Sequence, residues 1–161
     1  MRKRMLVLLA VFGVFMAITV AAQAEEPDAA DRSVDGRGWI WAKGTRVAML
    51  DGRGIVHMGI DGDVVVYDYA GDAVVKISAV PEEEPDGAAA QFRDVDPATT
   101  YTFDNFRGRM VVVGSDFRIE AEGDMGFRGH GRGVVEVDGR GWWKTLHDRG
   151  TWNGAVLRLG E

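Results

Sequence analysis

The chain has 161 residues, a net charge of −6 and no cysteine. This length suits one domain with its own core, and the lack of cysteine excludes disulfides, thiolate metal sites and lipid attachment through cysteine. The acidic balance argues against binding to nucleic acid or to anionic lipid, because like charges repel.

The first 24 residues have the three parts of a secretory signal peptide. Basic residues occupy positions 2–4, an uncharged apolar run covers 5–20, and Ala22-Gln23-Ala24 is the small-x-small pattern that precedes a cleavage site. The run is shorter than the roughly 20 residues of a membrane-spanning helix. We therefore expect an exported chain, periplasmic or extracellular, without a transmembrane span. Cleavage would remove Arg2, Lys3 and Arg4 but no acidic residue, so the mature chain is more acidic than the full one.

The rest of the chain is expected to hold one all-β domain over residues 35–160. Residues 25–34 are acidic and nearly free of large apolar groups, which is typical of a disordered leader. Two glycine-rich halves, 35–78 and 100–160, flank an acidic, proline-bearing linker at 79–99. No part of the domain shows sustained helical periodicity.

Runs of β-branched and aromatic residues predict many short strands. In the first half these are Trp39–Ala42, Val47–Leu50, Ile55–Met58, Val64–Tyr69 and Ala73–Ser78. In the second half they are Thr100–Phe103, Met110–Val113, Phe117–Ala121, Gly133–Val137, Trp142–Thr145 and Ala155–Leu159.

Pairs of glycine and aspartate separate these strands and predict tight hairpin turns, because both residues tolerate positive φ. The pairs are Asp51-Gly52, Asp61-Gly62, Gly71-Asp72 and Asp138-Gly139. We expect Gly52, Gly62 and Gly139 to adopt positive φ and to contact no ligand.

A short motif recurs along the chain. The sequence DGRGW at Asp35 returns as DGRGI at Asp51, after the length of about two short strands and two turns, and as DGRGW at Asp138. The two halves also resemble each other, which indicates either a duplication or the ordinary self-similarity of glycine-rich β sequence. Two architectures fit: an antiparallel meander folded into a sandwich or barrel, or a β-solenoid with glycines at its corners.

The stretch AKGTRVAMLDGRGIVHMGIDGDVVV, with short strands punctuated by glycine, resembles the bacterial envelope proteins known as putative autotransporter adhesin head domains. The resemblance covers about half of the mature chain. It implies a solenoidal envelope protein and carries over no catalytic residue. The aromatic strand GWIWA and the acidic linker depart from the usual appearance of that family.

No pattern of catalytic, cofactor or metal-binding residues is recognisable. No helix is predicted after a glycine cluster to hold a phosphate, and no serine lies in a nucleophile elbow. His57, His130 and His147 are isolated in sequence, which does not fit a zinc site. The aspartate pairs Asp61/Asp63 and Asp94/Asp96 lack a complete calcium loop. We therefore expect no cofactor, no metal and no enzymatic activity.

Two groups of residues are candidates for binding. Trp39 and Trp41 lie two positions apart and share one side of a strand, whereas Trp142 and Trp143 face opposite sides. Trp39, Trp41 and Trp143 could stack on sugar rings, or they could be core. Arg128, His130 and Arg132 also share one side of a strand and could hold an anion. Alternatively, they belong to a solvated face paired with acids such as Glu120, Glu122 and Asp124.

These observations favour an exported, non-enzymatic envelope protein that acts through a sheet surface. Its partner is unknown and could be an envelope protein or a glycan, and its edge strands could support self-association. The alternatives are a soluble module that binds a glycan or small ligand through exposed aromatics, and a periplasmic hydrolase.

Overall fold

The computed structural model describes residues 31–34, 38–79 and 92–160, which form one sheet of seven strands. The strands are β1 (Asp31–Val34), β2 (Trp39–Asp68), β3 (Val74–Ala79), β4 (Arg93–Asp94), β5 (Thr100–Lys144), β6 (Arg149–Thr151) and β7 (Ala155–Leu159). The predicted all-β class is confirmed, and the antiparallel sheet is not closed into a barrel. Among these described strands, β1 and β7 are the pair that runs parallel.

Some of the sequence predictions concern residues that the structure does not describe. The signal peptide, residues 25–30 of the leader and residues 80–91 of the linker lie outside them. The last four residues of the leader, which we expected to be disordered, form β1 and pair with β7. Within the described part of the chain, no helix is long and apolar enough to cross a membrane.

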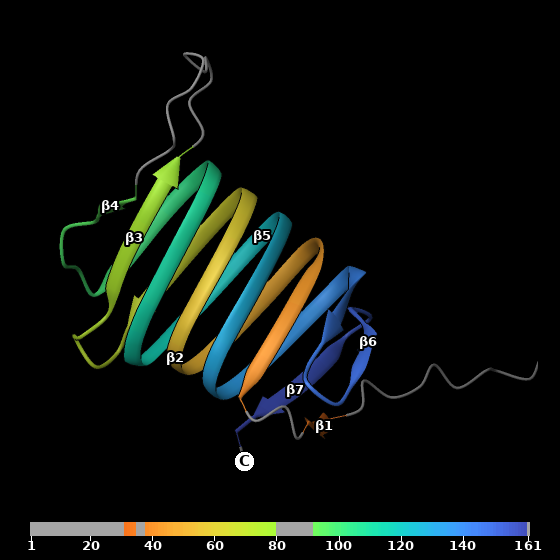
Figure 1. The fold of residues 1–161 in the computed structure, drawn as a ribbon. Coiled ribbons are helices and arrows are strands. Elements are labelled where there is room, and N and C mark those ends of the chain that lie inside the picture. Colours follow the sequence, from red (N-terminus) through yellow and green to blue (C-terminus); the bar gives the residue numbers. More distant parts are fainter. Residues whose placement is uncertain (1–30, 35–37, 80–91, 161) are drawn as a thin grey trace, which may run out of the picture.

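Two long strands, β2 and β5, build most of the fold by winding around each other as a coil (Figure 1). Ala48 of β2 pairs with Ala121 on one side and with Val137 on the other, so two turns of β5 flank each turn of β2. Ala121 in turn pairs with both Ala48 and Val64. One turn of the coil is therefore the stretch from Ala48 to Val64 in β2, and the equally long stretch from Ala121 to Val137 in β5.

Residues with positive φ gather at the bends of the coil. In β2 and just before it, Gly38, Arg46, Gly54 and Gly62 follow one another at intervals of half a turn, and Gly52 lies close to Gly54 at the same bend. Gly54 pairs with Gly114 and Gly131, and Gly62 pairs with Gly123, so glycines lie beside one another on adjacent turns. A glycine column of this kind lets strands bend where a Cβ would strike the neighbouring backbone. The coil therefore has two flat sides joined by bends.

The expected hairpins at three of the four glycine–aspartate pairs are wrong. Gly52, Gly62 and Gly139 do have positive φ, at 154°, 157° and 130°. However, β2 continues through the first two and β5 through the third. The short strands expected on either side pair with other turns of the coil, not with each other. Only Gly71-Asp72 lies in a turn between strands, where the Asp68 carboxylate accepts backbone N–H groups.

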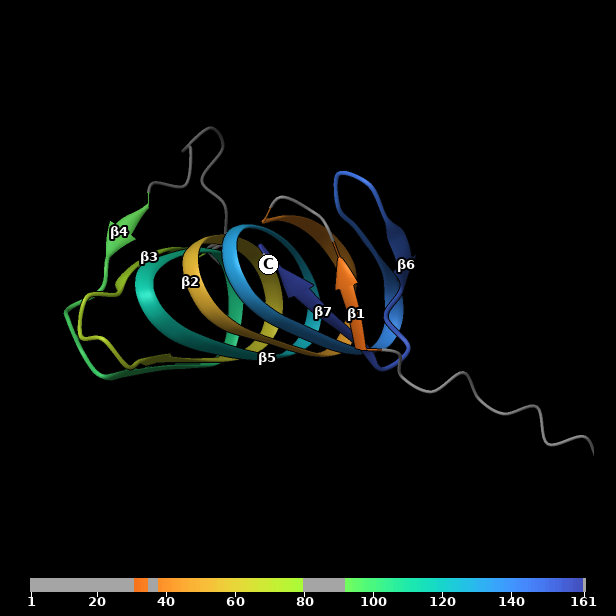
Figure 2. The same cartoon turned by 90° about the horizontal axis from the view of Figure 1, so that it is seen from below.

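The hydrophobic core lies inside the coil, between its two flat sides. Alternate residues of each strand point inward and are buried, among them Ala48, Leu50, Ile119 and Val137. Figure 2 shows the turns as stacked loops, with β3 and β4 at one end and β1, β6 and β7 at the other. Two layers with a core between them agree with the sandwich expectation in its coarse form.

Candidate functional site

Strand pairing arranges the outward side chains of different strands in rows across each flat side. On one side the middle row reads Lys76, Val111, His57, Arg128, Trp41, Lys144 and Arg149, from β3 to β6. The rows beside it contain Ile55, His130 and Trp39, and Arg109, Gly59, Gly126, Lys43 and Trp142. We call the surface formed by these three rows the aromatic-basic face.

Three tryptophans of this face are partly exposed. Trp39 is 39% exposed and Trp142 is 48% exposed, while Trp41 is half-buried between them in the rows. The rings of Trp39 and Trp41 stack, with centroids 5.9 Å apart and an interplanar angle of 13°. The Trp39 ring also contacts His130, with centroids 4.3 Å apart. The aromatic surface is therefore continuous across two strands.

A shallow, open trough lies on this face where two glycines leave the sheet without side chains. Gly59 and Gly126 pair directly, and the nearest atoms to a Cβ built at Gly59 lie 3.9 Å away. The trough is lined by Trp41, Trp142, His57, Arg109 and Arg128, among others. Aromatic rings and cationic groups thus surround a floor of bare backbone.

The charge of this face is mainly positive. Lys43, Arg109, Arg128 and Lys144 lie in adjacent rows with their side chains wholly or partly exposed. Partial burial, and next the positive charge of Arg128, lower the pKa of His57 below its ordinary value. His57 therefore stays neutral at neutral pH, and the arginines and lysines supply the charge.

The opposite flat side is acidic, and we call it the acidic face. Its middle row reads Thr102, Val65, Glu120, Met49, Glu136 and Val156, and a neighbouring row holds Asp63, Glu122, Val47 and Asp138. A third row holds Tyr67, Arg118, Asp51, Val134 and Arg158, so two arginines lie at this edge of the face.

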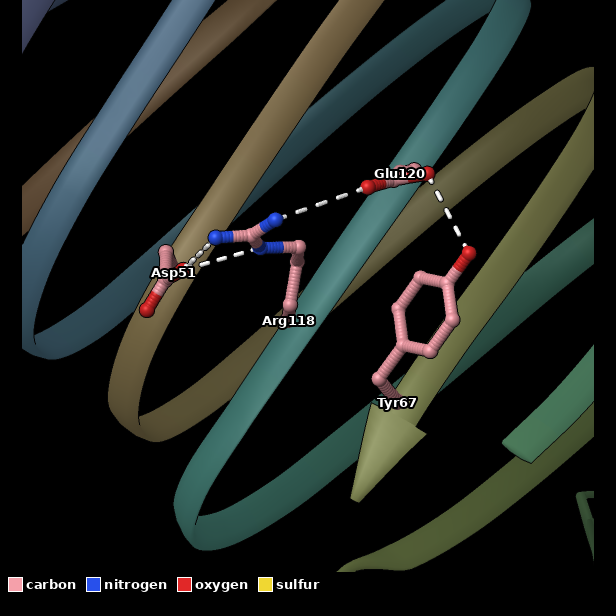
Figure 3. A network of polar contacts seen from close by, with 4 residues as sticks. All are labelled: Asp51, Tyr67, Arg118 and Glu120. Carbon is pink, nitrogen blue, oxygen red and sulfur yellow. Dashed lines mark hydrogen bonds and ion pairs between the residues drawn. The ribbon is translucent and has the colours of Figure 1, made fainter. Parts of the chain in front are cut away.

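Figure 3 shows the network that joins Tyr67, Arg118 and Asp51 of this third row to Glu120 of the middle row. The Arg118 guanidinium donates from Nε and Nη2 to Oδ2 of Asp51, at 2.9 and 2.6 Å. Its Nη1 lies 3.8 Å from Oε1 of Glu120, which also accepts a hydrogen bond of 3.4 Å from the Tyr67 hydroxyl on Oε2. The hydrogen bond to Asp51 and its charge raise the pKa of Arg118, and the charge of Glu120 raises the pKa of Tyr67. The arginine of this network is thus engaged by acids of the same face.

Four of the six residues singled out from the sequence lie on the aromatic-basic face: Trp39, Trp41, Arg128 and His130. Arg132 lies at a bend instead, opposite Arg53. The acids expected beside these groups lie in two places. Asp124 pairs with Thr45 and Asp61, near the bend where Gly62 pairs with Gly123. Glu120 and Glu122 lie on the acidic face, because the chain turns at Gly123.

The prediction that Trp143 could stack on a sugar ring is wrong, because its side chain is buried. It is 2% exposed, and its Nε1 donates a hydrogen bond of 3.0 Å to the Thr151 carbonyl. The exposed neighbour is Trp142. Alternation from the apolar Val135 and Val137 places position 143 inside, which is the sequence signal that identifies Trp142 as the outward residue. His57 and Arg109 were also missed, because strand pairing brings them to the trough that Trp41 lines. Lys43 was missed as well, although it lies two positions after Trp41 and so on the same side of the strand.

The carboxylates considered for calcium have other partners. Asp61 lies 3.5 Å from Nε of Arg107, Asp94 lies 3.0 Å from the Lys76 ammonium, and Asp63 accepts the N–H of Asn105 at 2.7 Å. Among the described residues no group of three or more histidines and carboxylates is placed to hold a metal ion. These aspartates therefore act in ion pairs and turns.

The chain was compared with family models, with curated proteins and with solved structures, and none of the three comparisons gives a match.

Proposed function

We propose that the protein is an exported, non-enzymatic binding module that holds an acidic glycan of the cell envelope on its aromatic-basic face. The observation that carries this proposal is the group of three partly exposed tryptophans in adjacent rows, beside Arg128, Lys43 and Lys144 on one flat surface. The signal-like first 24 residues of the sequence support the export part of the proposal.

The tryptophans supply contact with the sugar rings. An exposed group of aromatic rings marks an interaction surface, because it leaves apolar area in water. The flat rings of Trp39 and Trp41 lie nearly parallel, so successive sugar units could stack on them through their apolar C–H faces. The trough beside Gly59 and Gly126 leaves room for the glycan to pass close to the protein backbone.

The basic residues select acidic substituents on the sugar. Arginine binds carboxylate, phosphate and sulfate groups with paired N–H donors, and lysine adds a point charge. Arg128 lies between His57 and Trp41 in the middle row, next to the stacking surface. A neutral glycan would stack on the tryptophans and leave these cations without partners.

Binding is measured by tryptophan fluorescence while the mature chain is titrated with polygalacturonate and, separately, with neutral dextran. We expect polygalacturonate to bind at least tenfold more tightly, and Arg128→Gln to reduce this preference. Trp41→Ala combined with Trp142→Ala should weaken binding by about tenfold or more, with Trp39 left as the reporter.

Tyr69→Ala is the matched control, because Tyr69 is 56% exposed but lies off this face, stacked on Tyr67. Its affinity should equal that of the wild type. Equal affinity for both polymers, or unchanged affinity in the double tryptophan variant, would show that this face is not the glycan site.

A further inference from the structure

The two flat sides of the molecule carry opposite charge and lie on opposite sides of the same core. The acidic face holds the carboxylates of Asp63, Glu122 and Glu136, and its Arg118 is bound to Asp51. The aromatic-basic face holds Arg128 and Lys144 in its middle row. The molecule is therefore electrostatically polarised through its thickness.

The acidic face also has an apolar centre. Val47 is 39% exposed, Met49 beside it is partly exposed, and acids of β5 flank this pair on both sides. Val65 and Val156 lie outside these acids, because Glu120 separates Val65 from Met49 and Glu136 separates Met49 from Val156. All of these residues line one open depression. Apolar surface ringed by one sign of charge is the common pattern of a docking surface, with an apolar middle and a polar rim.

We propose that the acidic face binds the aromatic-basic face of a second copy of this chain. The tryptophans of one copy would cover the apolar centre formed around Val47 and Met49, and the cations around Trp41 would meet the carboxylates of the rim. Electrostatic complementarity of this kind selects the partner and fixes its orientation. The proposal goes beyond glycan binding, because it assigns a partner to the face that no glycan occupies.

The geometry makes the contact head-to-tail. Each copy uses different surfaces on its two sides, so the interface is heterologous, and repetition with no closing rotation gives an open stack. The glycan and the second copy compete for the aromatic-basic face, so an acidic polymer in excess should shorten the stacks.

Charge reversal on one face at a time tests this arrangement. Glu122→Lys with Glu136→Lys puts two lysines among the carboxylates of the acidic face, and Arg128→Glu with Lys144→Glu puts two carboxylates among the cations of the aromatic-basic face. Each variant should associate less than the wild type on its own, whereas an equimolar mixture should associate again, because the new lysines of one variant meet the new carboxylates of the other. Sedimentation velocity and light scattering on the mature chain, across a range of concentrations at low salt, measure the mass.

For the wild type we expect mass that increases with concentration and falls in 1 M salt, where the Debye length is only about 3 Å. Thermal melts followed by circular dichroism verify that each variant is folded. If a reversal variant does not fold, the neutral pair Glu122→Gln with Glu136→Gln replaces it and should weaken association by about tenfold.

A wild type that stays monomeric at every concentration overturns the proposal. So does a folded reversal variant that associates like the wild type, since association would then occur through strand edges. The neutral Glu122→Gln, Glu136→Gln variant gains no cation and should still bind polygalacturonate through its unchanged aromatic-basic face. Failure of the glycan proposal and failure of the stacking proposal are therefore separate results.

Discussion

Among single residues, glycine has two different structural roles in this fold. At Gly139 the backbone has a φ of 130°, and a Cβ would strike the Thr45 carbonyl and lie 2.7 Å from the Cβ of Arg46. At Gly59 the backbone is ordinary, and a Cβ would meet nothing closer than 3.9 Å. The first glycine is needed by the bend, while the second leaves space on the outer surface.

Substitution of these two glycines separates the two roles. Gly139→Val should lower the free energy of unfolding by about 1–3 kcal/mol or more, because a β-branched residue is strained at positive φ and also meets the adjacent turn. Gly59→Ala should change stability little and should instead disturb binding by filling the trough. Denaturant unfolding measures both variants, and equal loss in the two would contradict this assignment.

The glycines at the bends and the aspartates before them show which properties of a single residue can be predicted from the sequence. Positive φ at Gly52, Gly62 and Gly139 was predicted correctly from residue type alone. The partners of the aspartates were not, because Asp138 binds Arg46, 92 positions away, at 2.6 Å. Short-range patterns identify a backbone that must bend, but they contain no information about which distant strand lies beside it.

At the scale of elements, the same limit explains why hairpins were expected where long strands occur. Asp-Gly pairs favour a reversal of chain direction when the flanking runs can pair with each other. Here each run of β2 already has β5 on both of its edges, so the glycine serves as a bend inside a continuing strand. The interval from Asp35 to Asp51 in the repeated motif equals the turn of the coil from Ala48 to Val64.

The candidate site was predictable only in part for the same reason. Alternation along one strand correctly placed Trp39 with Trp41, and Arg128 with His130. These tryptophans and these basic residues lie on one face because Trp41 pairs with Arg128 and with Lys144. Those residues are separated by more than half the chain, and no local pattern reports the pairing.

The segment after β6 closes one end of the coil with a buried tryptophan. Trp152 is fully buried, its ring covers Gly44, and it contacts the ring of Phe127 with centroids 6.2 Å apart. Its Nε1 donates to the carbonyl of Trp142 at 3.0 Å. The residue thus fills the end of the core and joins it to β5.

Trp152→Ala should therefore destabilise the fold by about 3–5 kcal/mol, which is the usual cost of emptying a large aromatic site in a core. Trp142→Ala removes the same side chain from the outer surface, where it is 48% exposed, and should cost about 1 kcal/mol or less. Thermal and denaturant melts compare the two variants. A similar loss in both would mean that Trp152 does not close the core.

In the molecule as a whole, the two glycine-rich halves of the sequence, here called blocks, are interleaved parts of one coil. Every strand partner of β2 belongs to β5, and among the described residues β1, β2 and β3 do not pair with one another. Nearly all sheet contacts thus join residues that are far apart in sequence, which predicts slow folding because long loops must close first. It also means that neither block has a sheet of its own.

This interleaving predicts the behaviour of the chain when it is cut. A fragment of residues 25–88 contains β1, β2 and β3 and none of their partners, so it should show no cooperative melt by circular dichroism. Of the pairings that the structure describes, a fragment of residues 89–161 keeps those of β5 with β6 and with β7, over Gly133–Lys144, and should be largely unfolded. An equimolar mixture should regain the strand spectrum and a single transition, since all pairings between β2 and β5 can then form. If the first fragment alone melted cooperatively, the block would have to hold its own sheet, and the coil of β2 between turns of β5 would be wrong.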